Sequence, residues 1–315
     1  MRVAPSTGMA PSRATVRQTT LARDIRFDGI GLHTGERITV RLAPAPVDTG
    51  LVFVQGEDRV PALTSNVVST VLATTLGLPN GTRISTVEHF TAALAGMGVD
   101  NAIIEVDGTE LPILDGSSKI FVDRILEAGI VEQRAERLVY LVRRPFSVRE
   151  GVKEATFWPA PGFRVSYTIE FAHPAIGEQR WDGVITPAIF KRELAAARTF
   201  GFLKEVEMLR AAGLARGGSG ENAVVLDDTR VLNPEGLRMP DEFVRHKVLD
   251  AVGDLALAGR PIVGHFVAHR SGHELNQRLV REMLGDAANY ELCTARDAAD
   301  RGLEYVESPR MARAI

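Results

Sequence analysis

Apolar residues recur along this chain with two different periods, which predict two kinds of regular structure. In the segment 37–42, Arg-Ile-Thr-Val-Arg-Leu, polar and apolar residues alternate, as they do in a strand with one buried face. The segment 274–284 instead carries its apolar side chains on one face of a helix: Leu275, Leu279, Val280 and Met283. The chain is therefore expected to combine strands with amphipathic helices.

Strands and helices follow one another in the first part of the chain. The apolar, β-branched segment 67–76 precedes a predicted helix at 85–96, which opens with Ser-Thr as candidate N-caps. A predicted strand at 101–106 comes next, and a predicted helix at 120–128 completes the unit.

The second part repeats this order of elements. A strand-rich stretch covers 138–171, a helix at 243–258 ends at Gly259, and a strand at 262–268 leads to the helix at 274–284. In both parts, a helix with a histidine near its first turn runs to a glycine and then into a strand. This repetition predicts an α+β fold of two similar domains, each built of layered helices and sheet.

The predicted domain boundary falls in the charged stretch 132–137, between two apolar runs. We expect a first α+β domain at 16–134 and a second at 135–315, with an insertion at about 177–233 that has no counterpart in the first. Insertions of this kind often shape substrate sites. Residues 1–15 are rich in Pro, Ser, Ala and Arg and are expected to form a mobile N-terminal tail.

Composition narrows the class of protein. Of the 315 residues, 45% are hydrophobic and 24% charged, the balance of a soluble globular protein. The net charge of -3 gives no basic field, so no nucleic-acid partner is expected. The lone cysteine, Cys293, excludes an intrachain disulfide and is expected to be a buried apolar residue. Without a signal peptide or a run of about eighteen apolar residues, we expect a cytoplasmic protein with no stable membrane insertion.

The helix predicted at 243–258 carries the most informative chemistry. His246, Asp250 and Asp254 are spaced by four residues, so a helix presents them one above another on one face. Two ligands on neighbouring turns of a helix can bind one metal ion, whereas a catalytic zinc needs three protein ligands and a water. The motif therefore requires a third ligand and a general base from elsewhere in the chain.

The pair Glu88-His89 supplies both of these groups. Adjacent residues on a helix diverge by about 100 degrees, so one can bind the metal while the other reaches the metal-bound water. With His246 and Asp250, His89 completes a set of two histidines and one carboxylate, which is typical of hydrolytic zinc sites. The same set also suits iron(II) in oxygen chemistry, and these residues alone do not choose between the two metals.

His273 is the candidate acid. It follows Gly272 at the start of the last predicted helix, where a loop histidine can point into a cleft, and imidazole titrates near neutrality. Asp254 would hold its other ring nitrogen and favour the protonated form, or would be a solvated helix residue. Lys247 would meet a phosphate near the metal or be exposed. The glycine-rich turn 217–220 lacks the spacing and the lysine of a nucleotide-binding loop.

Six short segments of the chain occur in the order in which one family carries them. They are Gly-Leu-His-Thr-Gly at 31–35, Ile-Ser-Thr-Val-Glu-His at 84–89, Leu-Pro-Ile-Leu-Asp-Gly at 111–116, Arg-Thr-Phe-Gly-Phe at 198–202, Asp-Glu-Phe-Val-Arg-His-Lys at 241–247 and Ser-Gly-His at 271–273. Together they closely resemble the UDP-3-O-acyl-N-acetylglucosamine deacetylases, the zinc amidases of lipid A biosynthesis in Gram-negative bacteria. The resemblance extends from about Arg17 to the last helix.

This resemblance implies Zn²⁺ as the cofactor, a monomer, and a two-domain α+β fold with the active site between the domains. It implies that His89, His246 and Asp250 are the zinc ligands. By the same resemblance, Glu88 would activate the zinc-bound water, and His273 would protonate the departing sugar amine.

The resemblance also implies roles for the surrounding residues. Asp254 would orient His273, and Thr199 would help to stabilise the oxyanion. Lys247 would meet the diphosphate of the substrate, a UDP-linked acylated amino sugar. A passage for the fatty acyl chain would be bordered by residues of the insertion: Phe200, Leu203, Val206 and Ser219. Gly220 replaces a larger residue found there in some relatives, which bears on the preferred chain length.

Three other functions use the same residues. A metal oxygenase would share the two histidines and the carboxylate, but His273 and Glu88 serve hydrolysis and not oxygen activation. A binding protein with a structural zinc would need a fourth ligand and would favour cysteine, of which the chain has only Cys293. A zinc hydrolase acting on another amide would keep the whole constellation.

Overall fold

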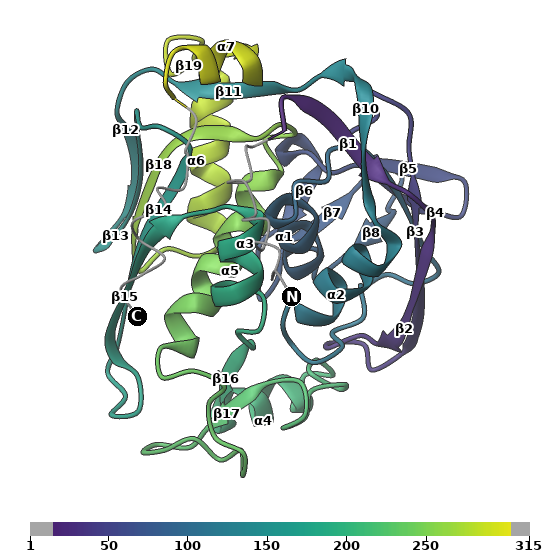
Figure 1. Cartoon of the computed structure of the whole chain (residues 1–315). Coiled ribbons are helices and arrows are strands. Elements are labelled where there is room, and N and C mark those ends of the chain that lie inside the picture. The colour runs from purple at the N-terminus through teal and green to yellow at the C-terminus, as the bar shows by residue number, and fades with distance from the viewer. Residues whose placement is uncertain (1–14, 304–315) are drawn as a thin grey trace, which may run out of the picture.

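Helices lie in the middle of the molecule, and sheets cover them on two sides (Figure 1). The structure is a computed structural model that describes residues 15–303. Helices α1 (Glu88–Gly96) and α5 (Glu242–Ala256) pack side by side at the centre, with α2 (Lys119–Ala128) beside α1 and α6 (His273–Gly285) beside α5. The α+β class predicted from the sequence is confirmed.

The first part of the chain forms the sheet on the side of α1 and α2. Its five strands follow the order β2-β3-β9-β4-β5, with β9 parallel to β4 and the other pairs antiparallel. The alternation at 37–42 becomes β3, whose buried residues are Ile38, Val40 and Leu42. The strands are β2 (Ile25–Ile30), β3 (Arg37–Pro44), β4 (Leu51–Gln55), β5 (Asp58–Pro61) and β9 (Ala102–Val106).

Two smaller sheets complete this part. One contains three antiparallel strands, β6 (Val67–Ser69), β7 (Thr75–Gly77) and β8 (Arg83–Ile84), preceded by the short 3-10 helix η1 (Thr64–Asn66). The other pairs β1 (Arg17–Leu21) with β10 (Ile130–Glu136). The boundary predicted between residues 134 and 135 falls within β10, and the division into two domains stays a prediction.

The second part forms a seven-stranded sheet on the side of α5 and α6. Strand β18 lies at its centre, antiparallel to β13 and parallel to β14 and to β11. The strands are β11 (Leu138–Val142), β12 (Phe146–Glu150), β13 (Lys153–Trp158), β14 (Phe163–Phe171), β15 (Gly177–Val184), β18 (Ile262–His269) and β19 (Tyr290–Thr294), which leads into α7 (Ala295–Asp300). Cys293 in β19 is buried, as expected.

The segment predicted as an insertion contains two different structures. Strand β15 pairs with β14 along its whole length and so belongs to the sheet. The later elements lie at one end of the molecule, below the central helices in Figure 1. They are β16 (Phe200–Phe202), α4 (Leu203–Ala211) and β17 (Val224–Leu226), reached through α3 (Pro187–Ile189) and the helical turn η2 (Phe190–Leu194).

Helix α1 begins three residues later than the Ser-Thr pair of the sequence suggests. Its first residue is Glu88, with no side-chain N-cap. Thr86 has a φ of 58°, outside the helical region, and its hydroxyl donates to the Glu110 carboxylate at 3.0 Å instead of to the helix. The hydroxyl of Ser85 contacts that of Thr75. Both candidate N-cap side chains therefore bond to residues outside the helix and do not cap it.

A glycine allows the two central helices to approach closely. A Cβ atom on Gly253 of α5 would stand 2.0 Å from the carbonyl oxygen of Glu88 on α1. Because the helices are so close, the Thr91 hydroxyl of α1 donates to the Gly253 carbonyl oxygen of α5 at 3.1 Å. The contact brings the start of α1 against α5 within one turn of Asp250.

Near the N-terminus, Thr15 is tied to strand β10. Of the tail predicted at 1–15, residues 1–14 lie outside the described residues, and the Thr15 hydroxyl donates to Glu132 at 2.7 Å. Across residues 15–303, no helix combines the length and the apolar character needed to cross a membrane.

Candidate active site

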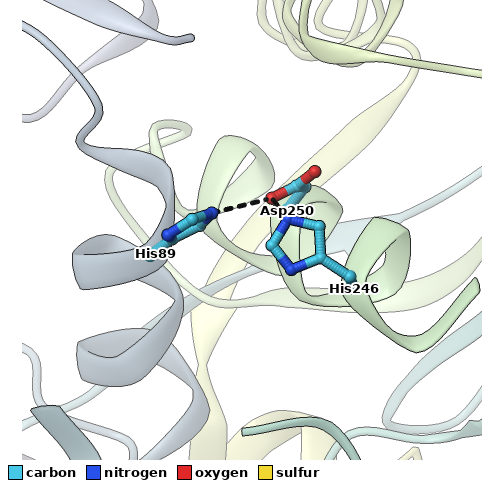
Figure 2. Close-up of side chains that lie close together, drawn as sticks. All are labelled: His89, His246 and Asp250. Carbon is cyan, nitrogen blue, oxygen red and sulfur yellow. Dashed lines mark ion pairs between the residues drawn. The ribbon is translucent and has the colours of Figure 1, made fainter. Parts of the chain in front are cut away.

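Three buried side chains converge between α1 and α5 (Figure 2). Nε2 of His89 and Nε2 of His246 lie 3.5 Å and 3.3 Å from the same oxygen, Oδ1 of Asp250. One ligand atom from each residue falls within 4.8 Å of the others, and the exposed fractions are 5%, 2% and 4%. The three ligands expected from the sequence therefore meet at one point.

Neighbouring groups fix how two of these side chains face the common point. Nδ1 of His246 lies 3.1 Å from the carbonyl oxygen of Ala197, which can only accept, so Nδ1 carries the proton and Nε2 offers its lone pair. The ammonium group of Lys247 donates to Oδ2 of Asp250 at 2.6 Å. Nε2 of His246 and Oδ1 of Asp250 are thus left as free acceptor atoms.

The arrangement fits a divalent metal ion. Oδ1 of Asp250 is fully buried and has no hydrogen-bond partner among residues 15–303. Such an atom carries a large desolvation cost unless a cation or a donor satisfies it. Nε2 of His246 carries no proton and cannot donate to this oxygen, and Nε2 of His89 faces the same oxygen, so the donor set is suited to a cation. Burial lowers the pKa of His246 to about 3, which keeps it neutral and able to bind a metal.

Glu88 lies next to the ligand set. It is buried, and its Oε2 accepts the backbone N–H of Thr74 at 3.1 Å. Burial raises the pKa of its carboxyl above the ordinary value, although the charges of His273 and His89 oppose that rise. A carboxylate with a raised pKa is a better general base at neutral pH than an exposed one.

His273 stands opposite Glu88, with its Nε2 3.8 Å from the Glu88 Oε1. Its Nδ1–H donates to Oδ2 of Asp254 at 2.9 Å, which holds the ring. Burial lowers the pKa of His273, but the charge and the hydrogen bond of Asp254 outweigh it and raise that pKa to about 9. The imidazole is therefore held as an imidazolium at neutral pH.

Asp254 is itself held by several groups. Besides His273, it accepts the hydroxyl of Thr74 at 2.7 Å and the side-chain amide of Asn276 at 2.9 Å. It is fully buried, so the alternative of a solvated helix residue is wrong. Thr74 thus touches both Glu88 and Asp254, through its backbone and its side chain, and fixes their spacing.

Thr199 lies in the segment that leads into β16. Its N–H donates to the carbonyl of Gly116, and its carbonyl accepts the N–H of Val224, both at 2.8 Å. The side chain is half-buried. Its role towards an oxyanion stays a prediction.

Lys247 is occupied by the site itself. Its ammonium pairs with Asp250, and its side chain keeps 21% of its surface exposed. Burial lowers the pKa of Lys247, but Asp250 outweighs that effect and the pKa is raised, so the group stays cationic. The exposed part leaves room for a second anionic partner, and the predicted contact with a diphosphate stays a prediction.

The residues predicted for an acyl passage occupy different places. Phe200 lies at the side of the insertion that faces α5, with its ring 5.0 Å from that of Phe243 and 6.3 Å from that of His246. Val206 packs over β16. Ser219 is exposed in a turn. Leu203 borders a cavity of about 620 Å³, whose other apolar residues include Phe171, Phe202 and Leu226.

A larger cavity lies away from this chemistry. About 710 Å³ in volume, it opens at the C-terminal ends of α1 and α5, beside Met97 and Leu255. None of the predicted catalytic or metal-binding residues lines it. The donor atoms and the pKa shifts, and not the size of a cavity, therefore identify the candidate site.

Sequence reasoning missed three groups that hold the site. The carbonyl of Ala197 and the N–H of Thr74 are backbone groups, which leave no signal in a sequence. Asn276, which binds Asp254, follows His273 by three residues and lies on the same helical face. The spacing of Asn276 was the one available signal.

Comparison with known proteins identifies relatives over most of the chain. Residues 18–285 match the family described as UDP-3-O-acyl N-acetylglycosamine deacetylase. A Myxococcus xanthus protein named UDP-3-O-acyl-N-acetylglucosamine deacetylase is 50% identical over 292 residues, which are 91% of this chain and 92% of the relative. Proteins of the same name from Saccharophagus degradans and Anaeromyxobacter sp. are 45% and 49% identical, over 93% and 90% of this chain and 98% and 93% of their own.

Proposed function

The chain belongs to the UDP-3-O-acyl-N-acetylglucosamine deacetylase family, and we propose that it removes acetate from UDP-3-O-(3-hydroxyacyl)-N-acetylglucosamine, a committed step of lipid A biosynthesis. One observation carries the proposal: a buried carboxylate, Glu88, and an imidazolium, His273, face each other beside three convergent metal ligands. Amide hydrolysis needs a base for water and an acid for the departing amine.

The metal proposed for this site is zinc. His89, His246 and Asp250 would hold it, two histidines and one carboxylate. Three protein ligands leave the fourth position of a catalytic zinc to water. Zinc bound there would polarise the acetamide carbonyl and lower the pKa of its water towards neutrality.

Glu88 is proposed as the general base. Its burial raises the pKa, so that the carboxylate accepts a proton from water more readily than an ordinary glutamate does. The Thr74 N–H holds Oε2 at 3.1 Å and leaves Oε1 on the side of His273. The proton therefore moves from the attacking water to Glu88.

His273 is proposed as the general acid. Asp254 keeps it protonated, so a proton is available at Nε2 when the C–N bond breaks. The sugar nitrogen then leaves as a neutral amine, which spares the reaction an amide anion. The hydroxyl of Thr199 is proposed to donate to the oxyanion, a contribution of about 3 kcal/mol for a single donor in such sites.

The diphosphate and the acyl chain of the substrate are proposed to contact residues that match their charge and polarity. The exposed end of the Lys247 side chain is proposed to meet the diphosphate, since an ammonium is a common phosphate partner. The acyl chain is proposed to run past Phe200 and Leu203 towards Val206 and Ser219, along β16 and α4 of the insertion.

The test is acetate release from the acylated UDP-sugar. We expect the purified protein to form one acetate and one free amine per substrate, without consuming oxygen. An enzyme that consumed dioxygen and released no acetate would be an oxygenase built on the same ligands. Hydrolysis of other acetamides but not of this substrate would point to a different amidase.

A further inference from the structure

Helix α5 carries a fourth acidic or basic side chain in register with the three already described. Glu242 precedes His246 by four residues, as His246 precedes Asp250 and Asp250 precedes Asp254. All four are buried, and Glu242 is 0% exposed. Yet Glu242 contacts neither the ligand set nor His273. A fully buried carboxylate with no part in the proposed chemistry needs another explanation.

The partner of Glu242 is Arg198, which is also almost fully buried, with 2% of its surface exposed. Oε1 of Glu242 accepts the backbone N–H of Arg198 at 3.0 Å and the side-chain Nε at 2.8 Å, and Oε2 accepts Nη2 at 3.2 Å. The remaining donors reach Glu235 and the carbonyl of Gly236, both at 2.7 Å. The guanidinium thus ties three segments together.

This pair fixes a short piece of backbone over the metal ligands. The residue before Arg198 is Ala197, whose carbonyl accepts the Nδ1–H of His246. The residue after it is Thr199, whose N–H is held by Gly116. Because Glu242 and His246 stand on successive turns of one helix, the pair sets the distance between the Ala197 carbonyl and the imidazole ring.

Stability alone does not account for the pair. Buried ion pairs can often be replaced by well-packed apolar residues without loss of stability, whereas the best-attested use of such groups is to fix one specific arrangement. The bonds to a backbone N–H and to a backbone carbonyl are of the kind that fix main-chain position.

We propose that Arg198 and Glu242 are positioning residues that hold the Ala197 carbonyl against His246 and so preset this imidazole for metal binding. The inference rests on the metal site of the proposed function, and on no particular substrate. Outer hydrogen-bond partners of metal-binding histidines commonly change metal affinity by about 10- to 100-fold when they are lost.

The experiment compares two variants with the wild type in two measurements. Zinc affinity is measured by competition with a chromophoric chelator, and stability is measured by urea unfolding of the metal-free protein. Glu242→Gln leaves the guanidinium charge without its buried counter-ion and with only the exposed Glu235 as a charged partner. Arg198→Met combined with Glu242→Gln removes both charges. The single glutamine oxygen can still accept the backbone N–H of residue 198, while the N–H of Arg238, which bonds to the other carboxylate oxygen of Glu242, loses its acceptor. The control is Arg245→Met with Asp241→Asn, a pair at the start of the same helix with 2.7 Å between Arg245 Nε and Asp241 Oδ1.

The expected result separates positioning from stability. The single variant loses both urea stability and zinc affinity. The double variant regains part of the stability that the single variant loses, because no unpaired guanidinium stays buried. It still binds zinc about 10- to 100-fold more weakly than the wild type, and the control pair changes zinc affinity less than about threefold. Zinc affinity that recovers together with stability in the double variant would overturn the proposal.

A second substitution covers the case in which the double variant does not fold. Arg198→Lys keeps the charge beside Glu242 but cannot reach Glu242, Glu235 and Gly236 together. We expect it to fold and to bind zinc at least about tenfold more weakly, and wild-type zinc affinity would overturn the proposal. Since no substrate is present, the outcome is independent of the acetate assay, which tests the deacetylase function separately.

Discussion

The carboxylates of Asp250, Asp254 and Glu88 lie in one buried site, and the hydrogen-bond partner of each determines what it can do there. Asp250 pairs with Lys247, which holds it ionised and leaves one oxygen free for a metal. Asp254 pairs with His273 and keeps that ring protonated. Glu88 accepts only a backbone N–H among the described hydrogen bonds, and burial raises its pKa. Environment, and not residue type, thus separates the proposed ligand, the proposed orienting group and the proposed base.

The role of Glu88 predicts a large effect from a small change. Glu88→Gln keeps the shape of the side chain and an oxygen that accepts the Thr74 N–H, but it removes the base. We expect kcat/KM for acetate release to fall by about 10²- to 10⁴-fold, with zinc content unchanged. Steady-state kinetics and metal analysis of the same sample check this. Activity within a few-fold of the wild type would exclude Glu88 as the base.

The pairing of His273 with Asp254 predicts how activity depends on pH. His273 donates its proton only while protonated, so activity falls as pH rises through its pKa, which stands at about 9 in this structure. Asp254→Asn removes the charge that raises this pKa, so the alkaline limb of the pH–rate profile must move to lower pH. A profile from pH 5 to 10 measures the shift.

The exposed neighbour of His273 provides the control for this shift. Glu274 lies next to it in the chain and bonds to Thr70 at the surface. Glu274→Gln is expected to leave the alkaline limb within about 0.3 pH units of the wild type, because an exposed charge is screened by solvent. An alkaline limb that stayed in place in Asp254→Asn would remove His273 from the role of acid.

At the scale of elements, the site depends on how closely α1 approaches α5. Gly253 has no room for a side chain, since a Cβ would stand 2.0 Å from the Glu88 carbonyl. This contact places Glu88 and His89 of one helix against His246 and Asp250 of the other. The helices also pack in the same layer between the two sheets (Figure 1).

Gly253→Ala is predicted to damage both stability and metal binding. Forcing α1 away from α5 costs about 1 to 3 kcal/mol, as overpacking of a core does, and moves His89 relative to Asp250. Urea unfolding of the metal-free protein and zinc affinity measure the two effects. Gly285→Ala is the matched control, because nothing lies within 4 Å of a Cβ there. Wild-type zinc affinity in Gly253→Ala would show that the close approach is not required.

The sequence predicts which side chains form the site better than it predicts the helix boundary and the tertiary contacts around them. The four-residue spacing of His246, Asp250 and Asp254 was enough to place them on one helical face, because α-helical geometry is local. The start of α1 was predicted three residues early, since Thr86 bonds to Glu110, far away in the chain. The pairing of Lys247 with Asp250 also escaped prediction: its spacing of three fits a helix, but the burial that favours it depends on tertiary packing.

At the scale of the whole molecule, the candidate site lies where the two parts of the chain meet. The first part supplies α1 with Glu88 and His89, and the second supplies α5 and His273 at the start of α6. The order helix, glycine, strand occurs in both parts, as the sequence predicted, with α1 leading to β9 and α5 leading to β18. Neither part holds the three ligands alone, so metal binding requires the two parts to pack together.

The central claim is that these residues form a zinc-dependent deacetylase, and metal removal tests it most directly. Acetate release from UDP-3-O-(3-hydroxyacyl)-N-acetylglucosamine would be measured before chelation, after chelation and dialysis, and after adding one equivalent of Zn²⁺. We predict loss of at least about 90% of the activity and its recovery with zinc, but no recovery in His89→Ala, because catalysis requires the metal held by all three ligands. Full acetate release by protein shown to be free of metal would contradict the account.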